Sequence, residues 1–354
     1  MMITLRQLLD HAGDYGYGVP AFNINNMEQG LAILKAADKM HAPVIIQASR
    51  GARAYAGDLM LQHLIKALVE MFPNVPICMH QDHGNSLETC QSALDYGFTS
   101  VMMDGSLEAD GKTPADYAYN VDITKKVADL AHARGASIEG ELGVLGSLET
   151  GMGDKEDGHG AEGVLSEEQL LTDPDEAVAF VKATNVDALA IAMGTSHGAY
   201  KFTRQPDGDI LAMHVIEEIH HKLPNTHLVM HGSSSVPQDL QDIFNEFGGE
   251  MPQTYGVPLD EIDRGIRSGV RKVNIDTDCR LAMAGIIRKV AQTQTSEFDL
   301  RKFMKPAAEA MEALCAERFE RFGCAGQADK IKPLSLEEMS QRYQAGTLNA
   351  VIRN

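Results

Sequence analysis

The stretch Ala188-Leu-Ala-Ile-Ala-Met193 is an apolar run without polar alternation, and Gly194-Thr-Ser-His-Gly198 follows it directly. A short apolar run of this kind is typical of a strand buried on both faces, as in a parallel sheet. Similar runs recur between Gly18 and Thr277, where they alternate with longer segments of helical period. This alternation predicts repeated β-α-β units.

Eight such runs occur along the chain, at residues 19–22, 44–48, 75–79, 100–103, 136–141, 188–193, 227–230 and 270–275. Eight strands, each followed by a helix, are the number that forms a closed (β/α)8 barrel. The pattern therefore favours an α/β fold of this type, also called a TIM barrel, over an open doubly wound sheet. Helix starts are also visible. The sequence Asp173-Pro174-Asp175-Glu176 combines an N-cap acid with Pro at the first helical position, and residues 113–116 resemble it.

Two regions exceed what a barrel needs. Residues 143–166 contain seven glycines and several acids without any period, which predicts a long Gly-rich lid loop after the fifth strand. After about residue 287 a polar, helix-rich tail follows. We therefore expect one domain over residues 1–354, with a barrel at about 18–287 and a helical C-terminal extension at about 288–354.

Composition excludes several classes of protein. With 44% hydrophobic and 23% charged residues among 354, the chain has the make-up of a globular protein. Its formal charge of −19 and lack of a basic run argue against nucleic-acid binding. No apolar stretch reaches the roughly 20 residues that span a bilayer. The first residues lack a secretory signal and the five cysteines form no CxxC pair, so we expect a cytoplasmic protein with reduced thiols.

Active sites of barrel enzymes lie at the carboxyl ends of the strands, so the polar residues after each run are candidates. His83, His197 and His231 follow three different runs. Three neutral imidazoles with an open fourth position form a catalytic zinc arrangement. Their spacing gives no independent support, since no HExxH or HxH occurs. Each histidine alone is equally consistent with a solvated or hydrogen-bonded side chain.

Three loops offer groups that suit a phosphate. Gly198, the stretch His231-Gly-Ser-Ser-Ser235 and the pair Asp276-Thr277 supply backbone N–H groups and hydroxyls near expected helix starts. Glycine and serine also make ordinary turns, so one such loop alone is weak evidence. Three positively charged residues lie in or just beyond the candidate loops, namely Arg50, Lys201 and Arg280. Their side chains would neutralise the charge of an anionic substrate locally.

Together the strand-end segments resemble the class II, metal-dependent fructose-1,6-bisphosphate aldolases. The segments that carry the resemblance are 22–26, 81–83, 194–198, 231–235 and 274–278, and the match runs from Arg6 to the tail. The resemblance implies Zn²⁺ on His83, His197 and His231. It also implies reversible cleavage of fructose 1,6-bisphosphate to dihydroxyacetone phosphate and glyceraldehyde 3-phosphate by a homodimer or homotetramer.

By the same resemblance, Asp82 transfers the proton on the C4 oxygen of the substrate, and Glu149 exchanges the proton at its C3. Glu141 would have a structural role next to these residues. The ketone's phosphate would be held, with a Na⁺ or K⁺ nearby, by Gly198, Gly232, Ser234, Asn274, Asp276 and Thr277. Lys201 and Ser233 are further expected substrate-binding residues. Asn23, Ser49 and Arg280 would face the other end of the substrate. A branch of the family has two adjacent glutamates in the lid, but here Leu148 precedes Glu149. The base is therefore Glu149, Glu156 or Glu162, with Glu149 preferred.

Other functions stay open at this point. A zinc hydrolase with the same fold would be expected to have an HxH motif after the first strand. Residues 22–25 of this chain are instead Phe-Asn-Ile-Asn. A non-catalytic metal-binding scaffold protein is the alternative from another class. Among substrates, tagatose 1,6-bisphosphate and sedoheptulose 1,7-bisphosphate compete with the fructose sugar. The residues do not distinguish glycolysis, gluconeogenesis and the Calvin cycle.

Overall fold

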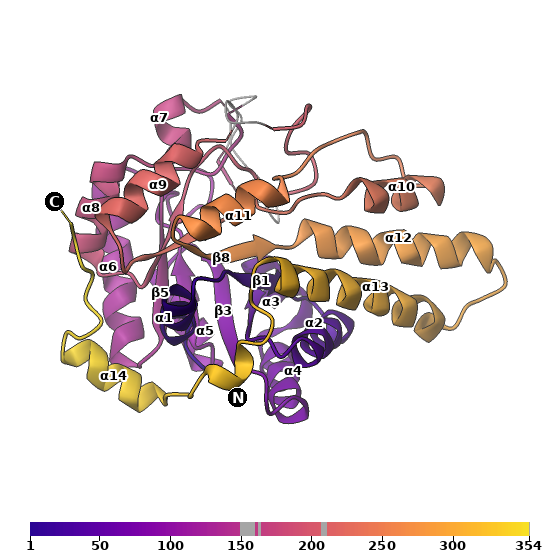
Figure 1. The fold of residues 1–354 in the computed structure, drawn as a ribbon, viewed down its shortest axis with the longest axis horizontal. Helices are drawn as coiled ribbons and strands as arrows, with labels where there is room; N and C mark the ends of the chain where they lie inside the picture. Colours follow the sequence, from indigo (N-terminus) through magenta and orange to yellow (C-terminus); the bar gives the residue numbers. More distant parts are fainter. Residues whose placement is uncertain (149–159, 162–163, 207–210, 354) are drawn as a thin grey trace.

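Eight parallel strands close into a barrel in chain order, β1 to β8 (Figure 1). The computed structural model describes residues 1–148, 160–161, 164–206 and 211–353. The strands are β1 (Val19–Asn23), β2 (Val44–Ala48), β3 (Ile77–Gly84), β4 (Ser100–Met103), β5 (Ser137–Leu142), β6 (Ala188–Ile191), β7 (His227–Met230) and β8 (Val270–Ile275). The predicted TIM barrel is confirmed.

Strand β3 differs from its predicted bounds at both ends. It starts at Ile77, after Pro76, whose nitrogen has no proton to donate to a neighbouring strand. It also continues to Gly84, with a register shift against β4 between Gln81 and Gly84. The polar stretch that was expected to follow the strand therefore belongs to it, and a backbone irregularity lies at His83, whose φ is 46°.

Helices surround the barrel (Figure 1). In the described part of the chain they are α1 (Leu5–Tyr15), α2 (Met27–Lys39), α3 (Arg50–Ala56), α4 (Asp58–Met71), α5 (Leu87–Asp95), α6 (Tyr117–Ala133), α7 (Glu167–Leu170), α8 (Pro174–Thr184), α9 (Met213–Lys222), α10 (Gln238–Glu246), α11 (Leu259–Arg267), α12 (Thr277–Thr293), α13 (Leu300–Arg321) and α14 (Leu336–Gln344), with a 3-10 turn at Ala328–Lys330.

The two predicted helix starts have different outcomes. Helix α8 begins at Pro174 as predicted, and the Asp173 carboxylate accepts hydrogen bonds from the backbone N–H groups of Asp175 and Glu176. The other prediction is wrong, because α6 begins at Tyr117 with Asp116 as its N-cap. Pro114 instead forms an antiparallel bridge with Leu107, and a turn in which Glu108 N donates to Thr113 O connects the two residues.

The two ends of the barrel are built differently. Helix α1 contacts β3, β5, β7 and β8, and it buries Leu5, Leu8 and Leu9 completely. This helix covers the end of the barrel at which β1 begins. At the opposite end the strands finish in buried polar residues, among them Asp82, Glu141 and Asn274. Polar groups therefore concentrate at the carboxyl ends, where the candidate site was expected.

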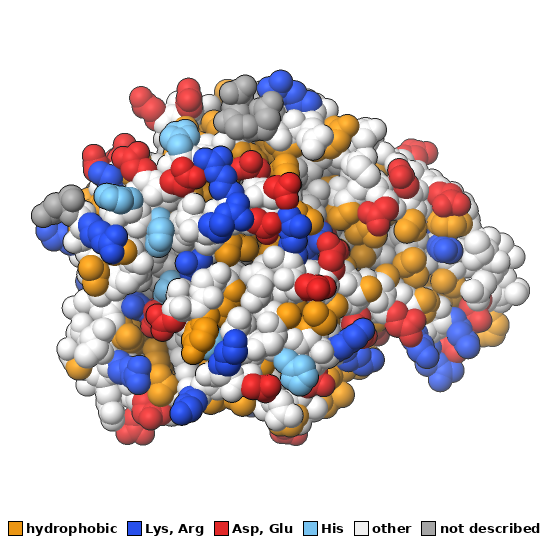
Figure 2. Space-filling model, viewed as in Figure 1, with side chains coloured by type: hydrophobic (Ala, Val, Ile, Leu, Met, Phe, Trp, Pro, Cys, Tyr) orange, Lys and Arg blue, Asp and Glu red, His pale blue; other side chains and the backbone are white. Residues whose placement is uncertain are grey.

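The C-terminal helices pack on the barrel's outer layer. Helices α12 and α13 lie side by side as a hairpin, and α13 also packs on α2 (Figure 1). Helix α14 packs on α6. Its Tyr343 hydroxyl also donates a hydrogen bond to Asp187, the residue before β6, at 2.9 Å. Lysine and arginine side chains are interspersed with acidic ones over the face shown in Figure 2. Among the helices in the described ranges, none combines the length and apolar character needed to cross a membrane.

Candidate active site

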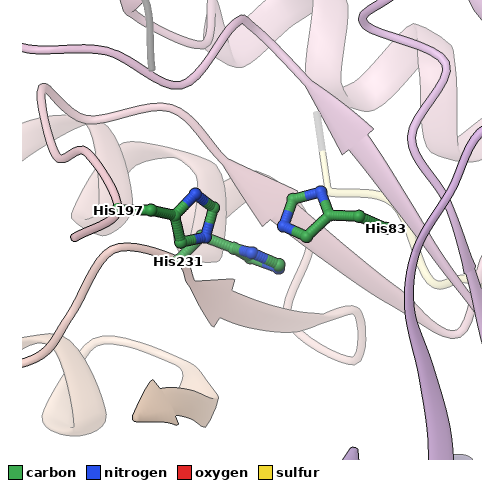
Figure 3. Close-up of side chains that lie close together, drawn as sticks. All are labelled: His83, His197 and His231. Atoms are coloured by element: carbon green, nitrogen blue, oxygen red, sulfur yellow. The ribbon is translucent and has the colours of Figure 1, made fainter. Parts of the chain in front are cut away.

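Three imidazole rings meet at the carboxyl end of the barrel (Figure 3). His83 lies in β3, while His197 and His231 follow β6 and β7. Each ring offers one nitrogen, and these three atoms lie within 4.8 Å of one another. The ring centroids are 4.7 to 5.7 Å apart. Residues that are far apart in the sequence are therefore close enough for their side chains to share one ion with metal–nitrogen bonds of roughly 2 Å.

Carboxylates stand behind two of these rings. Asp104 Oδ2 lies 3.2 Å from His83 Nδ1, and Glu139 Oε1 lies 2.7 Å from His231 Nε2. A carboxylate that engages one ring nitrogen orients the ring and makes the opposite nitrogen a better metal ligand. The donor set of three imidazoles, two of them held in this way, fits a divalent transition metal ion.

A fully buried ion pair lies beneath the histidines. Glu139 Oε2 is 2.9 Å from Lys272 Nζ and 3.3 Å from His80 Nε2. Although burial opposes ionisation, Lys272 and the hydrogen bonds from the two rings hold the pKa of Glu139 well below its usual range. Burial, assisted by the neighbouring His83 and to a smaller extent by Lys272, lowers the pKa of His231 to about 4. His231 is thus neutral at physiological pH, as metal binding requires.

A second set of possible ligands adjoins the first. His83, Asp104 and Glu141 also offer ligand atoms within 4.8 Å of one another. Burial and the neighbouring Asp104 raise the pKa of Glu141 well above its usual range. Glu141 accepts a hydrogen bond from the Ser106 hydroxyl at 3.3 Å. This carboxyl group lies to one side of the three imidazoles, next to His83.

Asp82 lies beside the imidazoles with one carboxylate oxygen fixed. Its Oδ2 accepts hydrogen bonds from Asn23 Nδ2 at 3.2 Å and from Gln47 Nε2 at 3.1 Å. Its Oδ1 is 3.9 Å from His83 Nε2. The side chain is almost completely buried, so its orientation is set by these contacts and not by water. Asp82 therefore presents Oδ1 toward the His83 ring.

A cleft with about 510 Å³ of empty space opens next to the imidazoles. Gly232 adopts a φ of 60°, and a Cβ there would approach Ser196 O to 2.5 Å, so only glycine fits. At the rim, Arg280 Nη2 lies 2.6 Å from Asp276 Oδ2. The cleft is lined by Asn23, Gln47, Asp82, His197, Gly198, Lys201, Gly232, Ser233, Ser234, Asn274, Asp276, Thr277 and Arg280. The predicted phosphate loops and the predicted proton carrier thus share one cavity.

The remaining predicted residues divide into two groups. Ser49 and Glu141 line an adjoining cleft together with His83 and His197. Glu149, the predicted base, and the alternatives Glu156 and Glu162 lie outside the described residues.

Four residues of the site were not predicted from the sequence, namely Gln47, Asp104, Glu139 and Lys272. A signal for each of them existed, and for three of them it is that alternate residues of a strand face the same side. Glu139 precedes Glu141 by two positions, and Lys272 precedes Asn274 by two. Each therefore shares a strand face with a residue that was predicted. Gln47 likewise precedes the predicted Ser49 by two positions, and Asp104 is the polar residue that directly follows the apolar run at 100–103.

The chain thus folds as a closed (β/α)8 barrel, and three imidazoles that could hold a metal ion converge at its carboxyl end. The family model described as "Fructose-bisphosphate aldolase class-II" matches residues 3–327. The chain belongs to this class-II fructose-bisphosphate aldolase family. Aldolases are carbon–carbon lyases, and membership of the class-II family implies that the protein uses a divalent metal ion.

Individual relatives agree with this assignment. The chain is 70% identical over 347 residues to fructose-bisphosphate aldolase 2 of Cereibacter sphaeroides, covering 98% of each chain. It is 61% identical over 352 residues to fructose-bisphosphate aldolase class 2 of Synechocystis sp., covering 99% of this chain and 98% of the relative. The crystal structure of the YdjI aldolase from Escherichia coli K12 shares the fold, with a TM-score of 0.69, 24% identity and coverage of 93% and 100%.

Proposed function

We propose that the protein is a zinc-dependent aldolase that reversibly cleaves fructose 1,6-bisphosphate to dihydroxyacetone phosphate and glyceraldehyde 3-phosphate. One observation carries the proposal above all. The three imidazole nitrogens within 4.8 Å of one another adjoin a cleft that also holds Asp82 and the predicted phosphate loops. A scaffold protein that only binds metal has no use for a buried carboxylate aimed at a ligand cleft.

Zinc would be held by His83, His197 and His231, because three neutral imidazoles with an open coordination position suit a catalytic zinc ion. When bound, the ion supplies Lewis-acid polarisation of the ketone carbonyl. The buried layer below contributes to this site by orienting the rings. Glu139 engages the His231 nitrogen on the far side of the ring, and Asp104 does the same for His83.

Asp82 carries the proton of the substrate's C4 hydroxyl. In the cleavage direction Oδ1 accepts this proton as the C3–C4 bond breaks, the C4 oxygen becomes the aldehyde, and the bond's electron pair passes to the ketone half as an enediolate. Glu149 then delivers a proton to C3, which completes dihydroxyacetone phosphate. A positioned base contributes about 10²–10⁴-fold, or roughly 3–5 kcal/mol, of the about 8–23 kcal/mol that enzymes typically supply. Charge stabilisation and positioning must therefore supply the rest.

The two phosphates of the substrate bind at opposite sides of the cleft. The ketone-side phosphate is held, with a Na⁺ or K⁺ ion, by the loops after β6, β7 and β8, which contribute Gly198, Lys201, Gly232, Ser233, Ser234, Asn274, Asp276 and Thr277. Asn23, Ser49 and Arg280 face the other end. The N-terminus of α12 at Thr277 adds its partial positive charge. Local positive charge of this kind accommodates a bisphosphate on a chain of net charge −19.

We further propose that residues 1–354 form one domain, that the protein assembles as a homodimer or homotetramer, and that it acts in the cytoplasm. Sedoheptulose 1,7-bisphosphate is a second substrate under this proposal.

A coupled assay for triose phosphate release tests the function. Purified protein should release triose phosphates from fructose 1,6-bisphosphate, lose this activity on chelation and regain it with added zinc. Running tagatose 1,6-bisphosphate in parallel compares kcat/KM for the two epimers. Absence of triose phosphate release from the zinc-loaded protein would refute the proposal, and a higher kcat/KM for the tagatose sugar would refute the choice of substrate.

A further inference from the structure

The loop after β7, residues 232–236, ends in an unusual backbone conformation. Val236 has a φ of 46°, a left-handed value that a β-branched residue rarely adopts. Its side chain is buried, at 1% exposure, so the loop cannot relax outward without exposing it. Strained backbone of this kind persists only where surrounding contacts determine it, and it clusters at functional sites.

Asp278, in the first turn of α12, supplies those contacts. Its Oδ1 accepts a hydrogen bond from Val236 N at 2.8 Å, and its Oδ2 accepts from Ser235 N and from Ser235 Oγ, each at 3.1 Å. The two backbone N–H groups at the end of the loop are thus used within the protein. The part of the loop that lines the cleft is the preceding stretch, Gly232 to Ser234.

Arg318 of α13 holds Asp278 in turn. Its Nη2 lies 3.3 Å from Asp278 Oδ2 and donates to Ser235 Oγ at 2.8 Å. The Arg318 and Asp278 side chains are 2% and 1% exposed, so solvent does not screen the ion pair. The mechanism proposed above uses neither residue. A guanidinium group is suited to this task because its fixed fork of donors engages two acceptors at once.

The opposite side of the loop is clamped as well. Val257 N donates to Ser234 O at 3.1 Å, and Gly256 packs against the backbone of Ser234 and Ser235 too closely to accommodate a Cβ. At the other side, Gln241 Nε2 donates to Val236 O at 2.9 Å, and the Arg318–Asp278 pair holds the N–H groups of Ser235 and Val236.

We propose that Arg318 is a positioning residue for phosphate binding, acting through Asp278 to hold the loop of residues 232–236. The inference rests on the proposed function, in which Gly232, Ser233 and Ser234 hold the ketone's phosphate. It makes the hairpin of α12 and α13 part of the substrate site, although α13 contributes no residue to the lining of the cleft.

The test compares Arg318→Met with Arg321→Met by steady-state cleavage of fructose 1,6-bisphosphate. Arg321 lies one turn further along α13 and pairs at the surface with Asp260 and Asp263, so R321M is a matched control. R318M should raise KM by about 10-fold or more, the effect of losing charge-assisted phosphate contacts, with a much smaller change in kcat. The inhibition constant of inorganic phosphate should rise in parallel, and zinc content should stay unchanged. R321M should match the wild type in all of these.

Because R318M leaves a buried carboxylate without its cation, Asp278→Asn/Arg318→Met provides a second variant without either charge. It should fold and still show the raised KM and the weakened inhibition by phosphate. A purely structural role predicts instead a smaller active fraction, hence a lower apparent kcat at unchanged KM. Wild-type KM and phosphate inhibition in the folded double variant would overturn the inference. Inactivity of the wild type would instead refute the proposed function.

Discussion

Glu139→Gln perturbs the proposed metal site without altering any of the three imidazoles. The substitution neutralises the carboxylate that accepts from His231 Nε2 at 2.7 Å and pairs with Lys272 at 2.9 Å. Loss of a supporting contact behind a metal-binding histidine typically weakens metal affinity about 10–100-fold, which corresponds to about 1.4–2.8 kcal/mol. The variant also leaves the fully buried Lys272 without its counter-charge, which costs about 3–5 kcal/mol of folding stability.

Two measurements separate these effects. Competition with a chromophoric chelator gives the zinc dissociation constant, and urea unfolding of the metal-free protein gives the free energy of unfolding. Lys272→Met/Glu139→Gln removes both charges, so it should recover most of the lost stability while its zinc affinity stays weak. Asp187→Asn is the matched control. It alters a buried carboxylate that lies 3.0 Å from His132 Nε2, away from the metal-binding rings, and should lower stability only. Wild-type zinc affinity in E139Q would refute the supporting role of Glu139.

Three further substitutions test individual assignments. His197→Ala should lose bound zinc while its circular dichroism spectrum stays that of a folded barrel, and wild-type zinc content in the purified variant would remove His197 from the ligand set. Asp82→Ala should keep zinc but lower kcat by about 10²–10⁴-fold, so a variant with most of its turnover would exclude Asp82 as the proton carrier. Arg280→Met should raise KM for the bisphosphate through loss of a charge-assisted contact, and a fall in kcat at unchanged KM would contradict that role.

The barrel was predictable because its strands are buried on both faces, so most of them appear as apolar runs, although β5 and β8 also carry charged residues. Seven of the eight observed strands differ from the predicted runs by at most two residues at either end. Strand β3 is the exception. Its second half contains His80, Asp82 and His83, polar residues that surround the site at the carboxyl end of the barrel, so hydrophobicity gives no sign that the strand continues.

The site was predictable to the extent that its residues follow strands. His83, His197 and His231 could be nominated from topology, but their convergence depends on closure of the barrel, which local sequence does not encode. The contacts of Glu139 with His231 and Lys272 join segments that are remote in the chain, and the contact between Asp104 and His83 joins the ends of two neighbouring strands. Pairings of this kind become visible only in three dimensions. The choice of Glu149 as the base stays a prediction.

The central claim is that His83, His197 and His231 bind one zinc ion. Anomalous diffraction at the zinc edge, from crystals of the zinc-loaded protein, tests it most directly. We expect a single peak at about 2.0–2.1 Å from one nitrogen of each ring, with the His231 contact made by Nδ1 because Glu139 engages Nε2. A peak on Asp104 and Glu141 with only His83 from the imidazole set, or no peak between the rings, would contradict the account.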